Sequence, residues 1–490
     1  MFSSTLLTLA TALPLALGQS YNSETVLGVY IFHRHGDRTA KITAPANLTD
    51  LGYRQVYTAG DYYRSRYIDS SSPYHISGIN SDIVLQSQLQ VSAPIDTVLQ
   101  NSATGFLQTL YPPVGTKLDT EELRNGSTVT APMQGYQLIP IGVAESGTGS
   151  EDSTWLQGTS DCAKAEISSN QYFTSTEYNK MYDQTKDFYH NLLPVISGMF
   201  SAEDATFENA YTIYDYINVA TIHNATIPSA SLLTNETLSQ LLALANNHEW
   251  NLAYNSSAPI RAVTGMTLAA QIVQFLNGTL ADAGSFTGQK LGIQFGAYGT
   301  FASFFGLAGL QDVSVDFTGA TDYASSMVVE MFTNASDAVT TSNYPADGDV
   351  YVRFLYHNGT ATASDPPTAY PLFGSGQNVL GWNDFVSDMN KFSLGDTGAW
   401  CTACGNSTGA CAAYVDSDAS GSSSGSSSQE SKTGCSNGVS PAVNGVIGAM
   451  VTLAVVLGLE ALVLLVCGLR VVSKKRLAQA SNGVSSEVKA

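Results

Sequence analysis

Two apolar runs near the ends of the chain limit what it can fold into. Leu6–Leu17 is too short to span a bilayer and ends in Ala16-Leu17-Gly18, a small-x-small pattern typical of signal-peptide cleavage. Val446–Leu469 is long enough to cross a membrane as a helix, and basic residues follow it directly. The sequence therefore predicts a signal peptide over 1–18, a type I transmembrane helix over 446–469 and a cytoplasmic tail over 470–490.

The alternative for the second run is a GPI signal, but the apolar tail of such a signal ends the chain, whereas a basic, polar segment follows here. Glu460 lies deep in the run, either as a protonated residue of a single span or as a contact for a partner helix. Both readings of Glu460 are compatible with one membrane-spanning helix.

Glycosylation sequons and cysteines indicate the same compartment. Sequons begin at Asn47, Asn125, Asn224, Asn235, Asn255, Asn277, Asn334, Asn358 and Asn406, all before the predicted membrane helix. Of the six cysteines, Cys467 lies within that helix, and the other five are disulfide candidates in an oxidising compartment. Cys401 and Cys404 form a CxxC pair, which we interpret as part of a structural clamp because no second CxxC or His pair supports zinc. These features predict a glycoprotein of the secretory pathway, at the cell surface or in a vacuolar or endosomal membrane.

The charge of the chain excludes one class of partner. Its net charge is −20, with only 21 Lys and Arg residues among 490. Nucleic acid is not expected to bind, because its phosphates require a basic surface. An anionic small molecule would need a local basic pocket, since the overall field repels it.

Between the two runs, residues 19–415 are predicted to form the folded ectodomain and 416–445 a Ser/Gly-rich stalk. Apolar runs with strand character are Val26–Phe32, Leu138–Val143, Leu291–Phe295 and Val350–Tyr356. Helical spacing is found in Thr49–Arg66, Thr97–Leu110 and Met266–Leu276. This alternation predicts an α/β domain with a largely parallel sheet, and the helix-rich stretch at about 150–285 predicts an inserted helical cap.

The first predicted strand runs directly into His33-Arg34-His35-Gly36-Asp37-Arg38-Thr39. Ligands of α/β sheets bind beyond the carboxyl ends of the strands, so this cluster is a candidate ligand site. An imidazole can attack phosphorus, and flanking guanidiniums can neutralise a phosphoryl group. The alternative, an exposed basic turn, is disfavoured because Arg and His are scarce in this chain.

The segment Arg34–Arg38 resembles the R-H-G-x-R signature of the histidine acid phosphatases, a family that includes fungal phytases. The resemblance extends to Leu48–Gly52, to Ser102-Ala103, to Leu110–Pro113 and to Tyr351–Phe354. It implies a phosphoglycerate-mutase-like fold, with a central mixed sheet flanked by helices and an inserted α-helical cap. It also implies that His35 forms a phosphohistidine, that Arg34 and Arg38 bind phosphate, and that no metal or organic cofactor is needed.

The chain departs from this family's pattern in three respects, of which Ala40 in place of the usual Pro is minor. Where the family has a further phosphate-binding Arg, this chain has Val98, and Ser92 falls on another commonly basic position. The family's His-Asp pair aligns with Ala297 and Tyr298. His357-Asn358 looks like a His-Asp pair, but it follows a segment that belongs after the real pair, so we interpret it as a coincidental match.

These departures leave three hypotheses, of which two give the cluster a function and the third does not. The first is hydrolysis of phosphate monoesters through His35, with Tyr298 or Asp37 as the proton donor, although a phenol's ordinary pKa of about 10 suits acid pH poorly. The second is a catalytically impaired, phospholigand-binding receptor, and the third is a surface glycoprotein. The sequence predicts neither the substrate nor the oligomeric state.

Overall fold

The computed structural model describes residues 24–115, 118, 120–143, 162–335, 337 and 339–414. The predicted signal peptide, stalk, transmembrane helix and tail lie outside these residues, as do Cys435 and Cys467. Within the described ranges, no helix has the length and apolar character needed to cross a membrane.

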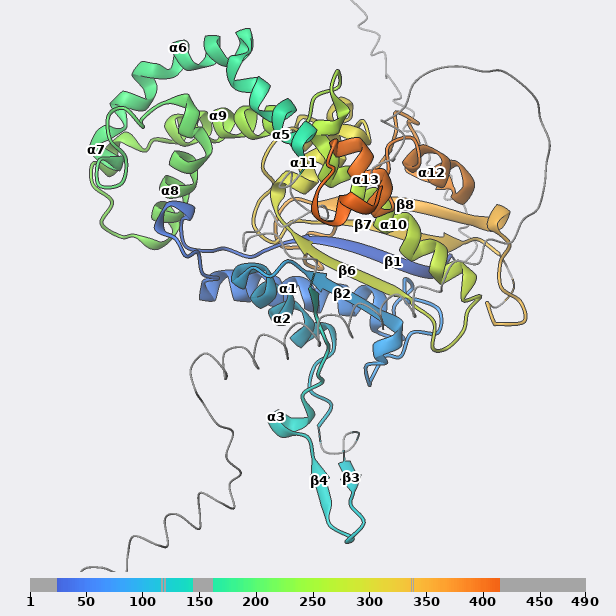
Figure 1. Ribbon diagram of the computed structural model, residues 1–490. Helices are drawn as coiled ribbons and strands as arrows, with labels where there is room; N and C mark the ends of the chain where they lie inside the picture. The colour runs from blue at the N-terminus through green and yellow to red at the C-terminus, as the bar shows by residue number, and fades with distance from the viewer. Residues whose placement is uncertain are drawn as a thin grey trace, which may run out of the picture. The chain divides into compact units, whose positions relative to one another are not determined.

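The centre of the fold is a mixed β-sheet (Figure 1). Its strands are β1 (Thr25–Arg34), β2 (Leu89–Ala93), β5 (Gly142–Val143), β6 (Leu291–Gly296), β7 (Ser326–Thr333), β8 (Val350–His357), β9 (Thr368–Tyr370) and β10 (Val379–Gly381). They lie in the order β10-β8-β7-β1-β6-β2-β5, and β9 pairs with β8. The pairs β1–β6, β6–β2 and β2–β5 are parallel, whereas β1–β7, β7–β8, β8–β9 and β8–β10 are antiparallel. The largely parallel sheet predicted from the alternation of elements is therefore wrong, and the mixed sheet implied by the family resemblance is found.

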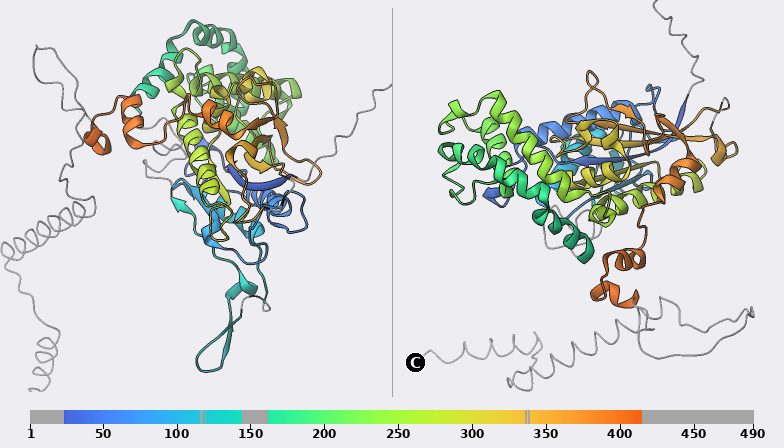
Figure 2. Two further views of the ribbon diagram at one scale, coloured as in Figure 1. Left: turned by 90° about the vertical axis from the view of Figure 1, so that its right-hand side faces the viewer. Right: turned by 90° about the horizontal axis from the view of Figure 1, so that it is seen from above.

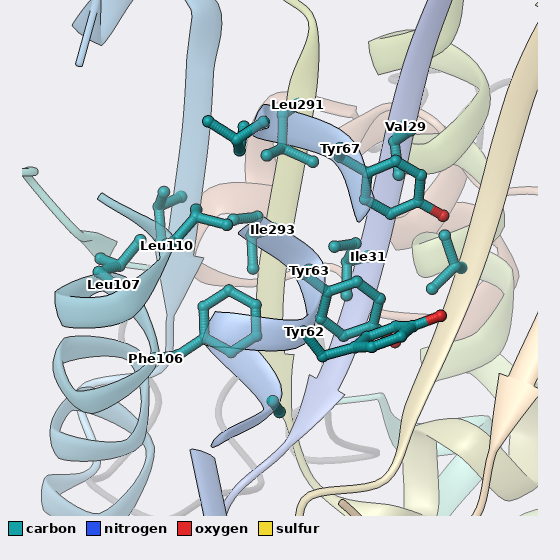
Figure 3. Packing of buried hydrophobic residues seen from close by; sticks show 14 of the residues in the cluster. Val29, Ile31, Tyr62, Tyr63, Tyr67, Phe106, Leu107, Leu110, Leu291 and Ile293 are labelled. Carbon is teal, nitrogen blue, oxygen red and sulfur yellow. The ribbon is translucent and has the colours of Figure 1, made fainter. Parts of the chain in front are cut away.

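Helices cover both faces of this sheet, because β1 alternates its side chains between two hydrophobic clusters. Val29 and Ile31 point to α1 (Asp50–Tyr63) and α2 (Thr97–Leu110), as Figure 3 shows. Tyr30 and Phe32 point to the opposite face, which is covered by α10 (Val263–Ala281), α11 (Tyr298–Leu307) and α12 (Trp382–Met389). Burial on both sides explains why this strand is apolar throughout.

A group of helices stands at one end of the sheet, at the upper left of Figure 1 and the left of the right-hand view in Figure 2. It comprises α5 (Ala163–Asn170), α6 (Thr176–Asn191), α7 (Leu193–Ile196), α8 (Ala210–His223) and α9 (Asn235–Ala253). Several of these helices share a hydrophobic cluster of their own, which includes Tyr189, Phe207 and Ile213. The stretch 150–285, for which a cap is predicted, also contains α10, but α10 packs against the sheet.

Two smaller features complete the described chain. A hairpin of β3 (Thr120–Glu122) and β4 (Thr128–Thr130), followed by α3 (Pro132–Gly135), projects away from the sheet (Figure 1). Near the end, α13 (Thr397–Cys404) carries two disulfides, Cys162–Cys404 and Cys401–Cys411. The CxxC cysteines thus bond to other partners, which ties the start of the helical group to the last described segment.

The predicted strands differ from the observed ones at two places. The strand expected over Leu138–Val143 is reduced to its last two residues, and Leu138 is exposed. Strand β7 was not predicted, because Glu330 interrupts its apolar run. This glutamate is fully buried, and its two oxygens lie 3.0 Å from Arg66 and 3.0 Å from Arg353. The pairing compensates the buried charge, so the strand tolerates it.

Candidate active site

The basic cluster Arg34–Arg38 lies at the carboxyl end of β1 and is buried. The parallel register with β6 places Gly296 opposite Arg34. His35 has no exposed surface, and Arg38 and Arg34 are only 1% and 5% exposed. Since buried guanidiniums are costly without partners, their surroundings must supply negative charge or hydrogen-bond acceptors.

The backbone of this loop is held by the starts of two helices. The Gly36 N–H donates to Ser102 Oγ of α2 at 3.3 Å, and the Asp37 N–H donates to Gln55 Oε1 of α1 at 2.7 Å. Gly36 and Gly52 lie in such close contact that a Cβ on Gly36 would be 2.2 Å from the Gly52 carbonyl oxygen. Only glycine fits at this contact, which fixes the loop against α1.

The imidazole of His35 has a defined hydrogen-bonding arrangement. Its Nδ1 lies 2.7 Å from the Gly36 carbonyl oxygen, which can only accept, so Nδ1 carries the proton in the neutral ring. Nε2 then carries the lone pair that a nucleophile needs. The ring lies 5.6 Å from the ring of Tyr323, in the loop before β7.

Arg34 is surrounded by aromatic rings and a carbonyl group. One guanidinium nitrogen donates to the Thr321 carbonyl, and the other lies 3.5 Å from the Tyr211 hydroxyl on α8. The guanidinium carbon lies 4.7 Å from the ring centre of Tyr323 and 5.3 Å from that of Tyr298. Burial raises the pKa of Tyr211 and of Tyr323, so both hydroxyls stay neutral.

Arg38 forms an ion pair with a residue of the cap. Its Nη1 lies 3.0 Å from Asp215 Oδ1, in the middle of α8, and the other oxygen of this carboxylate accepts the Lys41 N–H at 2.8 Å. Both side chains of the ion pair are almost completely buried. The cap therefore supplies the counter-charge for one of the two arginines.

Asp37 points to a different set of partners. Its Oδ2 accepts from the Thr49 hydroxyl and lies 2.6 Å from Nε2 of His223, the last residue of α8. Thr49 is also the N-cap of α1. These contacts of Oδ2 suit a residue that joins the loop, α1 and the cap.

The two residues aligned with the family's His-Asp pair follow β6 and lie next to the loop. Ala297 brings no polar side chain, and it is buried. The Tyr298 hydroxyl donates to Glu249 Oε2 of α9 at 2.6 Å, and its ring packs 4.7 Å from that of Tyr211. Val98 is buried within α2.

His357 lies elsewhere, at the end of β8, where its Nδ1 bonds to the Gly359 carbonyl and its Nε2 lies 3.2 Å from Asp365. In the sheet it pairs with Ser326.

Most of the partners contributed by the cap and by the loop before β7 have no local signal in the sequence. These residues are Tyr211, Asp215, His223, Glu249 and Tyr323. One weak signal exists: Tyr211 and Asp215 are four residues apart, and Asp215 is the only charged carboxylate in the otherwise apolar and neutral α8. That Asp215 is buried beside Arg34 and Arg38 becomes apparent only in the folded structure, where α8 packs against the loop.

Two cavities adjoin these residues. A small one beside Arg34, lined also by Tyr211, Asp215, Asp322 and Tyr323, has a volume of about 20 Å³. Since a water needs roughly 10–15 Å³, a phosphoryl group can enter only if side chains move. A wider one of about 450 Å³ lies beside Thr49 and His223. Among the described residues, no cluster of three or more His, Cys, Asp or Glu side chains could hold a metal ion.

Comparison with known proteins assigns the class of protein. The histidine phosphatase superfamily (branch 2) matches residues 39–357, and the chain belongs to this family. The match begins directly after Arg38, so the segment Arg34–Arg38 lies outside it.

Individual relatives are distant. Prostatic acid phosphatase of Bos taurus is 24% identical over 69% of this chain and 79% of its own length. Human prostatic acid phosphatase is 25% identical over 47% of this chain and 55% of its own length. Among solved structures, Hafnia alvei phytase superposes with a TM-score of 0.51 at 14% identity, covering 78% of this chain and 98% of the phytase. At this identity the superposition shows the fold alone, a central sheet flanked by helices.

Proposed function

We propose that this protein hydrolyses phosphate monoesters through a phosphohistidine at His35. The observation that carries this proposal is that His35 lies between Arg34 and Arg38 in the buried loop at the end of β1, with Nδ1 bonded to a carbonyl, so that Nε2 carries the lone pair of the neutral ring. In the first step, Nε2 bonds to phosphorus as the ester oxygen leaves. In the second, water releases phosphate and restores the imidazole.

The two arginines would bind the phosphoryl oxygens and stabilise the charge of the transition state. Losing one preorganised donor of this kind costs about 10²–10³-fold in rate in other enzymes. Arg38 would have to exchange part of its bond with Asp215 for a bond with phosphate, which also requires the small cavity to widen. Movement of α8 relative to the loop would supply both changes, because Tyr211 and Asp215 belong to this helix.

The lining of the small cavity favours a singly phosphorylated substrate. Asp215 and Asp322 place two carboxylates beside Arg34, where a polyanion would be repelled. One Hafnia alvei phytase structure is a complex with myo-inositol hexakis sulphate. For this chain we expect slow release of phosphate from inositol hexakisphosphate relative to a small monoester.

The test is a comparison of the full-length chain with its His35→Ala variant. Both are purified in detergent and assayed for phosphate release from para-nitrophenyl phosphate at mildly acid pH. Release by the parent chain, and its loss in the variant, is the expected result. Equal release by both proteins would remove the proposal, as would a failure to trap phosphate on His35 by rapid acid quenching.

A second candidate function is the binding of phosphate esters without turnover. It is favoured by Ala297 and Val98, which replace polar groups at positions where the family has a His and an Arg. Calorimetry with inorganic phosphate and a small phosphate ester tests it. Binding without release supports a receptor, and the absence of both leaves a structural surface glycoprotein.

We further propose that the protein is a single-pass type I membrane glycoprotein, with its phosphatase domain on the lumenal or extracellular side. The sequons and the apolar run Val446–Leu469 support this topology. Asn125, Asn224 and Asn277 are exposed in the folded domain, as glycan attachment requires. A shift in mass after glycosidase treatment, and protection of the domain from protease in sealed vesicles, are the expected results.

A further inference from the structure

The hydrolysis proposed above needs a proton for the leaving oxygen. The residues nearest the segment Arg34–Arg38, called the phosphate loop below, do not obviously supply it. Ala297 has no proton to give, and Asp37 is bonded to Thr49 and His223. A phenol such as that of Tyr298 has an ordinary pKa of about 10, so at the acid pH of the proposed reaction it is a weak proton donor on its own. A second group is needed that restores the phenol's proton.

Glu249 is in contact with Tyr298 from the cap side. Its Oε2 accepts the Tyr298 hydroxyl at 2.6 Å, and its Oε1 lies 2.8 Å from Nδ1 of His248. The Glu249 side chain is 15% exposed and that of His248 is 6% exposed. The carboxyl group is thus largely shielded from water, and both of its oxygens are hydrogen-bonded within the protein.

Tyr298 joins this carboxyl group to the phosphate loop. It directly follows Ala297 at the end of β6, the strand that pairs with β1. Its ring lies 5.3 Å from the Arg34 guanidinium carbon and 5.5 Å from Lys41 Nζ. Arg34 and Lys41 therefore lie beside the ring of Tyr298, whose hydroxyl bonds to Glu249. The two cations favour negative charge on the Tyr298 oxygen during the reaction.

The remaining ionisable groups around Glu249 are few in the described residues. His248 lies beside it on α9, and Tyr172, from the turn that follows α5, is close enough to be affected by its charge. Burial, together with the charges of Glu177 and Glu249, raises the pKa of Tyr172, so this phenol stays neutral. The groups hydrogen-bonded to Glu249 are Tyr298 and His248.

We propose that Glu249 acts through Tyr298 as the proton source for the leaving group, in place of the family's His-Asp pair. As His35 Nε2 bonds to phosphorus and the ester P–O bond breaks, the leaving oxygen takes the Tyr298 phenol proton. The bond between Tyr298 and Glu249 then reverses: Glu249, when it carries a proton, donates this proton to the phenolate oxygen and becomes a carboxylate. In the second step, water attacks the phosphohistidine, its proton passes through Tyr298 back to Glu249, and inorganic phosphate leaves.

This inference rests on the proposed phosphatase activity and makes a prediction that depends on the leaving group. Para-nitrophenolate is a stable anion and leaves with little help from an acid, whereas glycerol leaves as an alkoxide that must be protonated. General acid catalysis contributes roughly 10²–10⁴-fold, so its loss should be felt mainly with glycerol phosphate. Glu249 is a positioning and proton-supplying residue here, and Tyr298 is the group that touches the substrate.

The experiment uses the full-length protein and three variants. Glu249→Gln keeps the shape and removes the acid, and Tyr298→Phe removes the hydroxyl. Glu236→Gln is the control, because Glu236 is an exposed residue in the first turn of the same helix and the change preserves the sequon at Asn235. For each protein, kcat/KM is measured with both esters across the acid pH range, and thermal melting checks the fold.

With Glu249→Gln, we expect a loss on the order of 10²-fold with glycerol phosphate, a loss smaller than tenfold with para-nitrophenyl phosphate, and a flatter fall of activity as pH rises. Tyr298→Phe should follow the same pattern, and Glu236→Gln should match the parent.

Equal losses with both esters would show that the Glu249–Tyr298 bond only holds the cap in place, and would overturn the inference while leaving the phosphatase intact. Unchanged activity of Glu249→Gln with glycerol phosphate would overturn it too. A parent chain that releases phosphate from neither ester refutes the proposed function, and the inference with it.

Discussion

The contact between the phosphate loop and α1 can be tested with one methyl group. Gly52 lies in the first turn of α1, and a Cβ at this position would be 2.0 Å from the Asp37 carbonyl oxygen and 2.6 Å from the Asp37 nitrogen. Both atoms belong to the backbone, so no side chain can rotate to relieve the contact. In Gly52→Ala, the loop and the helix must therefore separate.

The size of this separation follows from the distances. Real Cβ atoms essentially never lie closer than 3.0 Å to another heavy atom, so the 2.0 Å contact requires a shift of about 1 Å. Such a shift stretches the bond from the Thr49 N–H to the Asp37 carbonyl oxygen, which is 3.0 Å long. Overpacking of this kind costs about 1–3 kcal/mol of unfolding free energy, and a displacement of about 1 Å at reacting groups costs about 10²-fold in rate.

The assay is phosphate release from para-nitrophenyl phosphate, together with thermal melting in the presence and absence of inorganic phosphate. Gly299→Ala is a matched control, because Gly299 also lies in the first turn of a helix at the site, and a Cβ there meets no atom within 4 Å. This control should keep its activity and melt at the same or a slightly higher temperature. If Gly52→Ala behaves like Gly299→Ala, the loop is not held by α1 in the way described.

Three further predictions concern stability. Glu330→Gln should lower the unfolding free energy by about 3 kcal/mol, measured by denaturant titration, because two largely buried guanidiniums lose their shared carboxylate; a change below 1 kcal/mol would contradict this. Replacing Cys162 and Cys404 by Ser should lower the unfolding free energy by about 3 kcal/mol more than replacing Cys401 and Cys411, because the first bridge closes a sequence separation of 242 and the second only 10. Equal melting temperatures of the two variants would contradict this. Burial lowers the pKa of His33 from 6.5 to about 4, so the unfolded chain binds this proton first and stability should fall by about 3 kcal/mol as pH drops from 6.5 to 4; His33→Phe should reduce that slope, and an identical slope would refute the assignment.

The sequence was most informative where one local pattern determines the structure. Thr97–Leu110 was predicted as a helix from its spacing and is found with those bounds, since Asp96 caps its first turn by accepting from the Leu99 N–H. The strand Val26–Phe32 was found as part of β1 because its apolar run faces two helical layers. The basic cluster after this strand could be placed at a sheet edge for the same reason.

The sequence was least informative where distant segments provide the missing partner. Strand β7 has a charged residue in its centre, and only the folded protein shows the two arginines that compensate it. Likewise, Asp215 and Glu249 are far from Arg34–Arg38 in the sequence. Their contacts with Arg38 and Tyr298 form only because α8 and α9 are folded against the end of β1. Tyr298 could be predicted as a site residue, but its hydrogen-bond partner could not.

The His-Asp pair that the family resemblance leads one to expect, and that Ala297 and Tyr298 replace in our interpretation, can be considered through the geometry of the site's two halves. The half formed by β1, α1 and α2 holds His35 and both arginines through backbone contacts, and it contains few positions that could change without displacing them. The half formed by the cap contributes side chains only, from helices with their own hydrophobic cluster. In the mechanism proposed above, an acid on α9 therefore supplies the proton without altering the loop Arg34–Arg38, because one residue at the end of β6 reaches it. Tyr298 has the length to do so, and a shorter side chain such as Asp at this position would not reach the carboxyl group to which the tyrosine is bonded.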